Sequence, residues 1–272
     1  MSLQPNYPVE NAGLQYINGL QLAYVGTTSF SVATGQTRDS TNINDIKVTA
    51  ALTVSISASG VNGLDTGTIA ASTLYYVFAI GNSCANDPTV ATNASGGGVF
   101  QAGQALISLS RTAPVLPTGF DMFKRIGAIR VNGSTHVEPF NQTGLGNNRT
   151  MRYQAPVAPG SASTAGSTTY TTIGTLTALV PQIACEVLVS AALTPNSAGN
   201  VLYLAPYGNT AIASNGFADA LSAEVTGHAQ QATMRTPGAL NAAGTPIIEV
   251  DYATTSGSDT VAFLVVGYVD QV

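Results

Sequence analysis

Short apolar runs separated by turn-forming residues recur along the whole chain and predict β-strands rather than helices. Residues 46–57 end in strict alternation of apolar and polar side chains, which is typical of a strand with one buried face. Residues 74–80 are continuously apolar, so we expect a strand that is covered on both faces. We expect further strands over 105–110, 123–131, 134–140, 171–180, 185–193, 201–207, 224–234, 247–252 and 261–269.

The dipeptide Asn132-Gly133 separates two of these expected strands. Both residues tolerate the positive φ angles that a two-residue type I′ turn requires. The sequence therefore predicts a tight hairpin that joins residues 123–131 to residues 134–140.

The segment 155–169 is rich in Pro, Gly, Ser and Thr, and it has no charge, no aromatic residue and no large apolar residue except Val157. Such a composition forms no core and is typical of a linker. We therefore expect an all-β fold of two β-sandwich, jelly-roll-like domains, with residues 1–154 before this linker and residues 170–272 after it. Prolines and a glycine near the start predict an extended N-terminal arm in the first domain.

Charged residues make up 8% of the 272 residues, against about 25% in an average soluble domain, whereas 44% are hydrophobic. A monomer usually keeps charge on its surface for solubility. We therefore expect a surface of hydroxyl and amide side chains, much of it covered by neighbouring copies in a homo-oligomer. The alternative is a soluble protein with a neutral, hydroxyl-rich surface.

The net charge of −5 is unevenly distributed. Residues 1–155 hold eight basic and seven acidic side chains, whereas the remainder holds one basic and seven acidic. An acidic chain with two lysines cannot neutralise a run of phosphates, so we expect no nucleic-acid binding. No window approaches about 18 consecutive apolar residues, and the first ten residues lack the pattern of a signal peptide, so we expect neither a membrane span nor secretion.

The sequence lacks the familiar catalytic and metal-binding patterns. His136 and His228 have no companion at metal-ligand spacing, and there is no nucleophile elbow or phosphate-binding loop. Cys84 and Cys185 fall in different expected domains, so we expect two free thiols. We therefore expect no catalytic, cofactor-binding or metal-binding residues and no enzymatic activity. A glycan depolymerase is an alternative, because two carboxylates suffice to cut a glycosidic bond.

Two groups of oxygen-bearing side chains could bind Ca²⁺: residues 39–45, and the pair Glu249 and Asp251. The 39–45 loop lacks the sixth-position glycine and the closing glutamate of an EF-hand. Capping of a turn by Asp and Asn side chains accounts for this loop more simply.

The densest group of basic residues contains Lys124, Arg125 and Arg130. On a regular strand, Lys124 and Arg130 share one face, while Arg125 lies on the other among apolar neighbours. An arginine in such surroundings usually pairs with a carboxylate. Two interpretations stay open: an intrachain pair with Asp121 or Asp39, or an ion pair between subunits.

Tyr203, Tyr207 and Phe217 lie in a turn-rich stretch that also contains Asn209 and Asn215. A flat apolar ring beside directional amide groups is what a sugar-binding surface needs. Ordinary packing in the core and in turns is the other interpretation of these side chains.

Several motifs occur in a fixed order along the chain. They are residues 18–20 (NGL), 35–42 (GQTRDSTN), 62–67 (NGLDTG), 75–78 (YYVF), 117–130 (PTGFDMFKRIGAIR) and 266–270 (VGYVD). Together they resemble a β-rich module of structural proteins in tailed-bacteriophage particles. No single motif is specific, so the ordered set carries the resemblance, which covers roughly residues 13–145.

The resemblance implies a non-enzymatic component of the virion, assembled in the host cytoplasm. Such a component is a surface decoration, fibre or spike protein that stabilises or extends the head or tail. The resemblance also implies a homo-oligomer, with a trimer favoured, that contacts other virion proteins such as the major capsid or tail proteins. The alternative function is a glycan-binding module for host attachment, carried by Tyr203, Tyr207 and Phe217.

Overall fold

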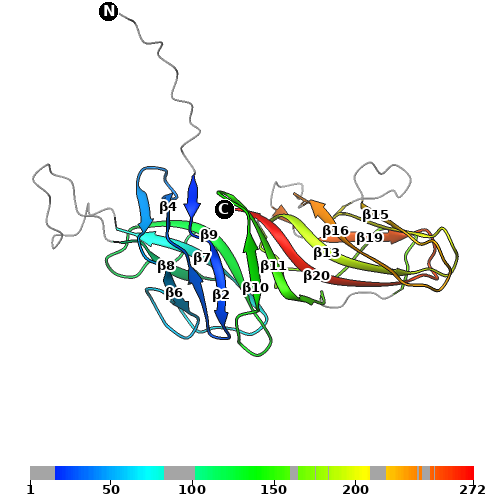
Figure 1. Cartoon of the computed structure of the whole chain (residues 1–272), viewed down its shortest axis with the longest axis horizontal. Helices are drawn as coiled ribbons and strands as arrows, with labels where there is room; N and C mark the ends of the chain where they lie inside the picture. Colours follow the sequence, from blue (N-terminus) through cyan, green and yellow to red (C-terminus); the bar gives the residue numbers. More distant parts are fainter. Residues whose placement is uncertain are drawn as a thin grey trace, which may run out of the picture.

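The computed structural model describes residues 16–82, 102–159, 165–174, 176–182, 184–208, 219–237, 239–240, 246–247 and 249–272. These residues form an elongated molecule of antiparallel sheets, and none of them belongs to a helix (Figure 1). The predicted all-β fold is confirmed. Within these ranges, no helix is long and apolar enough to cross a membrane.

Three small sheets build the N-terminal half of the molecule (Figure 1). In spatial order they contain β1 (Ile17–Gly19), β4 (Gly35–Arg38) and β5 (Asp45–Val48); β2 (Leu22–Gly26), β3 (Ser29–Val32) and β6 (Leu52–Ser55); and β8 (Gln104–Ser108), β7 (Thr73–Gly81) and β9 (Met122–Val131). β3 and β5 bury alternate residues, as Phe30 and Val32 show on β3. The expected strand over 46–57 is therefore two strands, because β5 pairs with β4 whereas β6 pairs with β3.

β7 is buried on both faces, as its continuous apolar sequence predicts. Its odd-numbered residues from Tyr75 to Ala79 face the main hydrophobic core. Its even-numbered residues from Leu74 to Ile80 belong to a second, smaller cluster. Three partly buried side chains pack against this second cluster: Leu116, Phe120 and Phe123.

Two sheets pack face to face in the C-terminal half. The larger contains β10 (Phe140–Thr143), β11 (Asn148–Val157), β20 (Thr260–Gln271), β13 (Ala184–Thr194) and β16 (Gln230–Pro237). The smaller contains β12 (Thr171–Thr172), β19 (Val250–Thr254), β14 (Val201–Pro206) and β15 (Asp219–Ser222), and a short ribbon pairs β17 (Ala239–Leu240) with β18 (Pro246–Ile247). Tyr252 on β19 and Phe263 on β20 join the two sheets, with ring centroids 4.8 Å apart.

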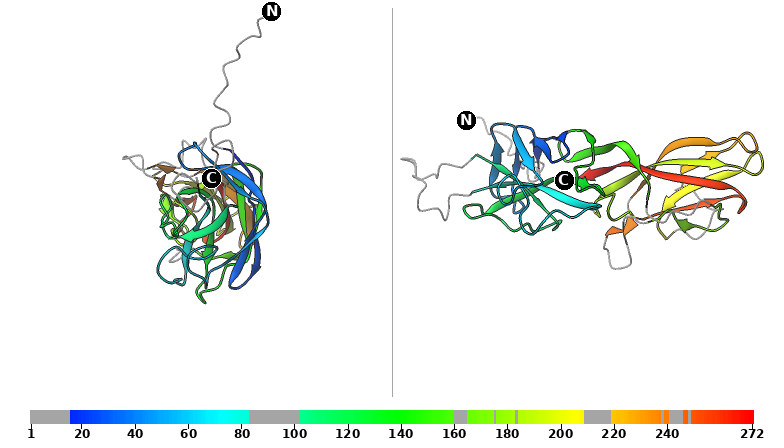
Figure 2. Two further views of the ribbon diagram at one scale, coloured as in Figure 1. Left: turned by 90° about the vertical axis from the view of Figure 1, so that its left-hand side faces the viewer. Right: turned by 90° about the horizontal axis from the view of Figure 1, so that it is seen from below.

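The larger sheet continues across the expected domain boundary. β20 runs from the far end of the C-terminal half to the middle of the molecule, where it pairs with β11 (Figure 1; Figure 2, right). Residues 155–157, which we expected to begin a linker, belong to β11. The Tyr268 hydroxyl donates to the carbonyl of Ala128 at 3.1 Å, and one core cluster contains residues of both halves. The two-domain division stays a prediction, but the described halves share a sheet and a core.

A short hairpin forms at Asn132-Gly133, where Val131 and Val137 make an antiparallel bridge and the Asn132 N–H donates to the carbonyl of His136 at 2.8 Å. The expected two-residue turn is wrong, and the pairing ends before β10, which pairs with β11 and not with β9. The side-chain oxygen of Asn132 accepts hydrogen bonds from the backbone N–H groups of Ser134 and His136, at 3.0 and 3.2 Å. The positive φ angle falls on Thr135, at 58°. Asn132 therefore caps a longer loop instead of occupying a tight turn.

A β-bulge changes the buried face along β20. Val261, Phe263 and Val265 are buried before the bulge, whereas Tyr268 and Asp270 are buried after it. The bulge includes Gly267, where an added Cβ would lie 2.0 Å from the carbonyl oxygen of Met151. Only glycine fits there, so this residue lets one strand serve both halves of the core.

Candidate functional site

The sequence motifs of the N-terminal half meet around the sheet of β7, β8 and β9. The Ser40 N–H donates to the carbonyl of Phe123 at 2.8 Å, which attaches the 35–42 motif to the edge of β9. The Asp65 carboxylate accepts a hydrogen bond from the Val115 N–H at 3.0 Å, which attaches the 62–67 motif to the segment before β9. One backbone and one side-chain hydrogen bond therefore position these loops around one sheet.

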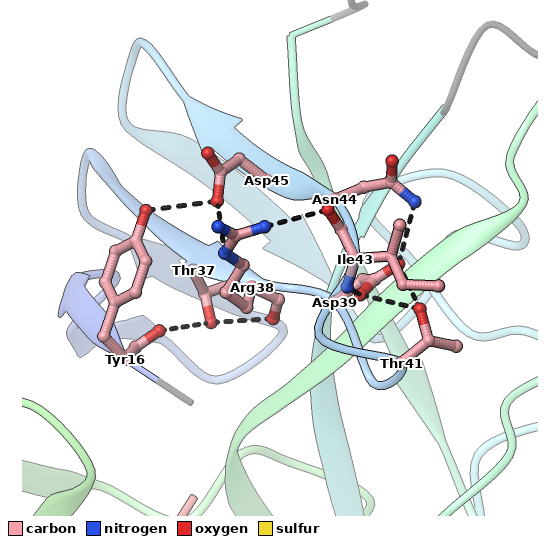
Figure 3. Close-up of polar contacts among 8 residues, drawn as sticks. All are labelled: Tyr16, Thr37, Arg38, Asp39, Thr41, Ile43, Asn44 and Asp45. Atoms are coloured by element: carbon pink, nitrogen blue, oxygen red, sulfur yellow. Dashed lines mark hydrogen bonds and ion pairs between the residues drawn. The ribbon is translucent and has the colours of Figure 1, made fainter. Parts of the chain in front are cut away.

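Asp39 organises the loop between β4 and β5 (Figure 3). Its buried carboxylate accepts hydrogen bonds from the Thr41 hydroxyl at 2.9 and 3.0 Å, the Ile43 N–H at 2.9 Å and the Asn44 amide at 3.2 Å. Burial alone raises the pKa of this carboxyl, but the hydrogen bonds outweigh burial and hold the pKa below its ordinary value. The carboxylate therefore caps the loop, as the turn-capping interpretation expects.

The neighbouring Asp45 is also engaged within the chain (Figure 3). Its Oδ1 lies 3.2 Å from Nε of Arg38 and accepts a hydrogen bond from the Tyr16 hydroxyl at 3.2 Å. At the second candidate calcium position, Asp251 accepts hydrogen bonds from Thr172 and Gly208, both at 3.1 Å. Among the described residues, no group of three His, Cys, Asp or Glu side chains is arranged to hold a metal ion.

A second bulge, at Ile126 in β9, rearranges the basic cluster. Arg125 lies opposite Phe78 and Gly127 lies opposite Val77, so Ile126 has no opposite residue. Arg125 and Arg130 therefore share the face of the smaller cluster. The expectation that Lys124 shares a face with Arg130 is wrong, because the extra residue reverses the alternation.

Two members of the basic cluster are paired within the chain, so the structure favours the intrachain interpretation for them. Arg125 donates to the Asp270 carboxylate at 2.5 Å, and Arg130 pairs with Glu138. These carboxylates replace Asp39 and Asp121, which the sequence suggested as partners. Lys124 makes no ion pair with a carboxylate in the part of the chain that the structure describes.

Arg149 is a structural residue that the sequence did not distinguish from the other arginines. Its side chain is 2% exposed and donates to the backbone carbonyls of Gly19 at 2.7 Å and Leu20 at 2.6 Å. Burial lowers the pKa of this guanidinium to about 10. Leu20 has a positive φ of 56°, so Arg149 fixes an unusual backbone turn. No sequence signal identifies such a partner, because backbone carbonyls occur at every position.

The proposed sugar-binding aromatic residues are only partly described. Tyr203 is half-buried on β14, and Tyr207, 46% exposed, follows the end of that strand. The third aromatic residue, Phe217, lies outside the described residues. The same holds for Cys84 and for the side chain of Cys185, the two expected free thiols. A glycan site at these tyrosines therefore stays a prediction.

Comparisons with known proteins identify no family. No protein-family model matches the chain, and no curated protein matches it. Among solved structures, the chain is similar to one in "Structure of infectious bursal disease virus Gx strain", with 14% identity over 94% of this chain and 68% of that chain. The TM-score of 0.23 is too low for this similarity to support a conclusion about function.

Proposed function

We propose that this chain is a non-enzymatic structural component of a tailed-phage particle. It acts as a surface decoration, fibre or spike protein that stabilises or extends the head or tail through contacts between identical copies. A homotrimer that also contacts capsid or tail proteins is the expected assembly. One feature of the C-terminal half carries the proposal, namely an uncharged face of the larger sheet.

This uncharged face is built by β20, β13 and β16, whose alternate residues point away from the core between the sheets. At one end of the face, a guanidinium nitrogen of Arg235 lies 3.6 Å from a carboxylate oxygen of Glu186. Beyond them, six outward positions that are at least partly exposed carry no charge: Ala192, Gln231, Thr233, Ala262, Leu264 and Val266. Leu188 and Ser190, on the same side of β13, are also uncharged but are already buried within the chain.

A face of this kind suits contact between copies better than contact with water alone. The cores of protein interfaces are depleted in charged residues, and small neutral side chains allow two sheets to approach closely. Each Å² of apolar surface that a second copy covers stabilises the assembly by about 25 cal/mol before the cost of association. The ordered resemblance of the N-terminal motifs to a virion module supports the particle as the place of assembly.

Mass spectrometry of purified particles of the phage that encodes this chain tests the proposal. We expect its peptides in stoichiometric amounts, and we expect antibodies against the folded chain to label the head or tail in electron micrographs. Complete absence of its peptides from infectious particles would rule the proposal out.

A further inference from the structure

A surface cavity of about 640 Å³ lies at the outer edge of β9, beside Ser40 and the end of β20. Five chain segments that are separate in sequence meet there. The residues that line the cavity include Ser40, Arg111, Lys124, Asn148 and Gln271, and none of the lining side chains is acidic. The volume lies within the range of small-molecule sites and exceeds the size of a single ion.

Positive charge in this cavity is only partly compensated. Asp270 neutralises Arg125, as described above. Arg111 donates to the neutral side-chain oxygen of Gln182 at 3.3 Å, and Lys124 has no carboxylate partner among the described residues. Burial lowers the pKa of Lys124, and the adjacent Arg125 lowers it further. A bound anion would offset both effects, because its negative charge favours the protonated amine.

Neutral hydrogen-bonding groups accompany these two cations. Ser40, Asn148 and Gln271 are exposed side chains at the cavity wall, with hydroxyl or amide groups that both donate and accept. Arg111 carries the planar guanidinium that matches a carboxylate with two parallel hydrogen bonds. This combination suits a ligand that has one carboxylate and several hydroxyl groups.

We propose that the cavity binds an acidic sugar unit, with its carboxylate on Lys124 and Arg111 and its hydroxyl groups on Ser40, Asn148 and Gln271. The site lies apart from Tyr203 and Tyr207, which come from the opposite half of the chain. It is independent of the assembly proposed above, because the uncharged face contains none of its residues.

Isothermal titration calorimetry of the full chain with D-glucuronate tests this site, with D-glucose and inorganic phosphate as comparison ligands. We expect saturable, salt-sensitive binding of glucuronate with a Kd of about 1 mM, and no binding of glucose. The Lys124→Met variant should weaken glucuronate binding about tenfold, since it removes one charge-assisted contact. Lys47→Met is the matched control, because Lys47 is the only other lysine, and it should leave binding unchanged.

A second measurement keeps the test independent of the folding of the variants. Acetylation of the wild-type chain, read by mass spectrometry, should be slowed by glucuronate at Lys124 and not at Lys47. The proposal is overturned by the absence of saturable glucuronate binding, by equal binding to the Lys124→Met variant, or by equal acetylation of Lys124 with and without glucuronate. If phosphate binds as tightly as glucuronate, the proposed recognition of a sugar is wrong and the cavity is a simple anion pocket.

Discussion

Arg125 and Asp270 form a buried ion pair at 2.5 Å although 145 positions separate them in the sequence. The same guanidinium donates to the backbone carbonyl of Gln271 at 2.5 Å. These contacts attach the end of β20 to β9. The strand that crosses from the C-terminal half is therefore fixed by charge as well as by its apolar side chains.

Replacing Arg125 by Met should destabilise the fold by about 3–5 kcal/mol, because it leaves the Asp270 carboxylate buried without its cation. Urea unfolding measures this loss as a lower free energy of unfolding. The double variant Arg125→Met with Asp270→Asn should recover part of the loss, since the uncompensated charge is gone. Equal stability of the wild type and Arg125→Met would show that the pair does not hold the halves together.

The bulge in β20 depends on Gly267. Gly267→Ala places a Cβ against the carbonyl of Met151, which is backbone and cannot rotate away. We expect a loss of about 3 kcal/mol, at the upper end of the range for overpacking. Gly257→Ala is the matched control, because nothing lies within 4 Å of its added Cβ. Thermal unfolding of the two variants should separate them clearly, and equal melting temperatures would contradict the role of the bulge.

Asp39 should make the stability of the fold depend on acidity. Its folded-state pKa lies below its ordinary value, so its contribution is complete above about pH 4 and is lost as the pH falls through the folded pKa. Asp39→Asn should cost about 1–3 kcal/mol at pH 7, because hydrogen bonds to the carboxylate weaken. Urea midpoints measured from pH 7 to pH 2 should converge for the two proteins. A constant difference over this range would show that the carboxylate charge is irrelevant.

The uncharged face should lose its ability to associate when a charge is introduced at its centre. Ala262 is exposed on β20 in this face, and Ala262→Glu should dissociate the oligomer while circular dichroism stays unchanged. Ala51→Glu is the matched control, since it makes the same change at an exposed turn of the N-terminal half. Sedimentation velocity should show monomers for the first variant and oligomers for the second. Dissociation by both variants would place the contact elsewhere.

The sequence predicts a strand and its burial well where the whole run of residues is apolar. β7 is apolar throughout, so its burial on both faces follows directly from composition. The faces of β9 and β20 could not be predicted by simple alternation, because one extra residue in each bulge reverses it. The available signal was a glycine inside each apolar run, Gly127 and Gly267.

The candidate sites also differ in how far the sequence predicts them, because some depend on neighbouring residues and others on distant segments. The Asp39 cap is local, so its turn-forming residues indicate it directly. The pairing of Arg125 with Asp270 and the cavity around Lys124 depend on where distant segments meet, and no local pattern records those meetings. The composition of 155–169 indicated a linker, although its first residues complete a strand whose partner, β20, lies at the end of the sequence.

Multi-angle light scattering of the purified, unaltered chain tests the central claim most directly. The account predicts a stable oligomer at micromolar concentration, with a mass three times the 27.7 kDa of one chain for the favoured trimer. A folded species of 27.7 kDa at that concentration would contradict it.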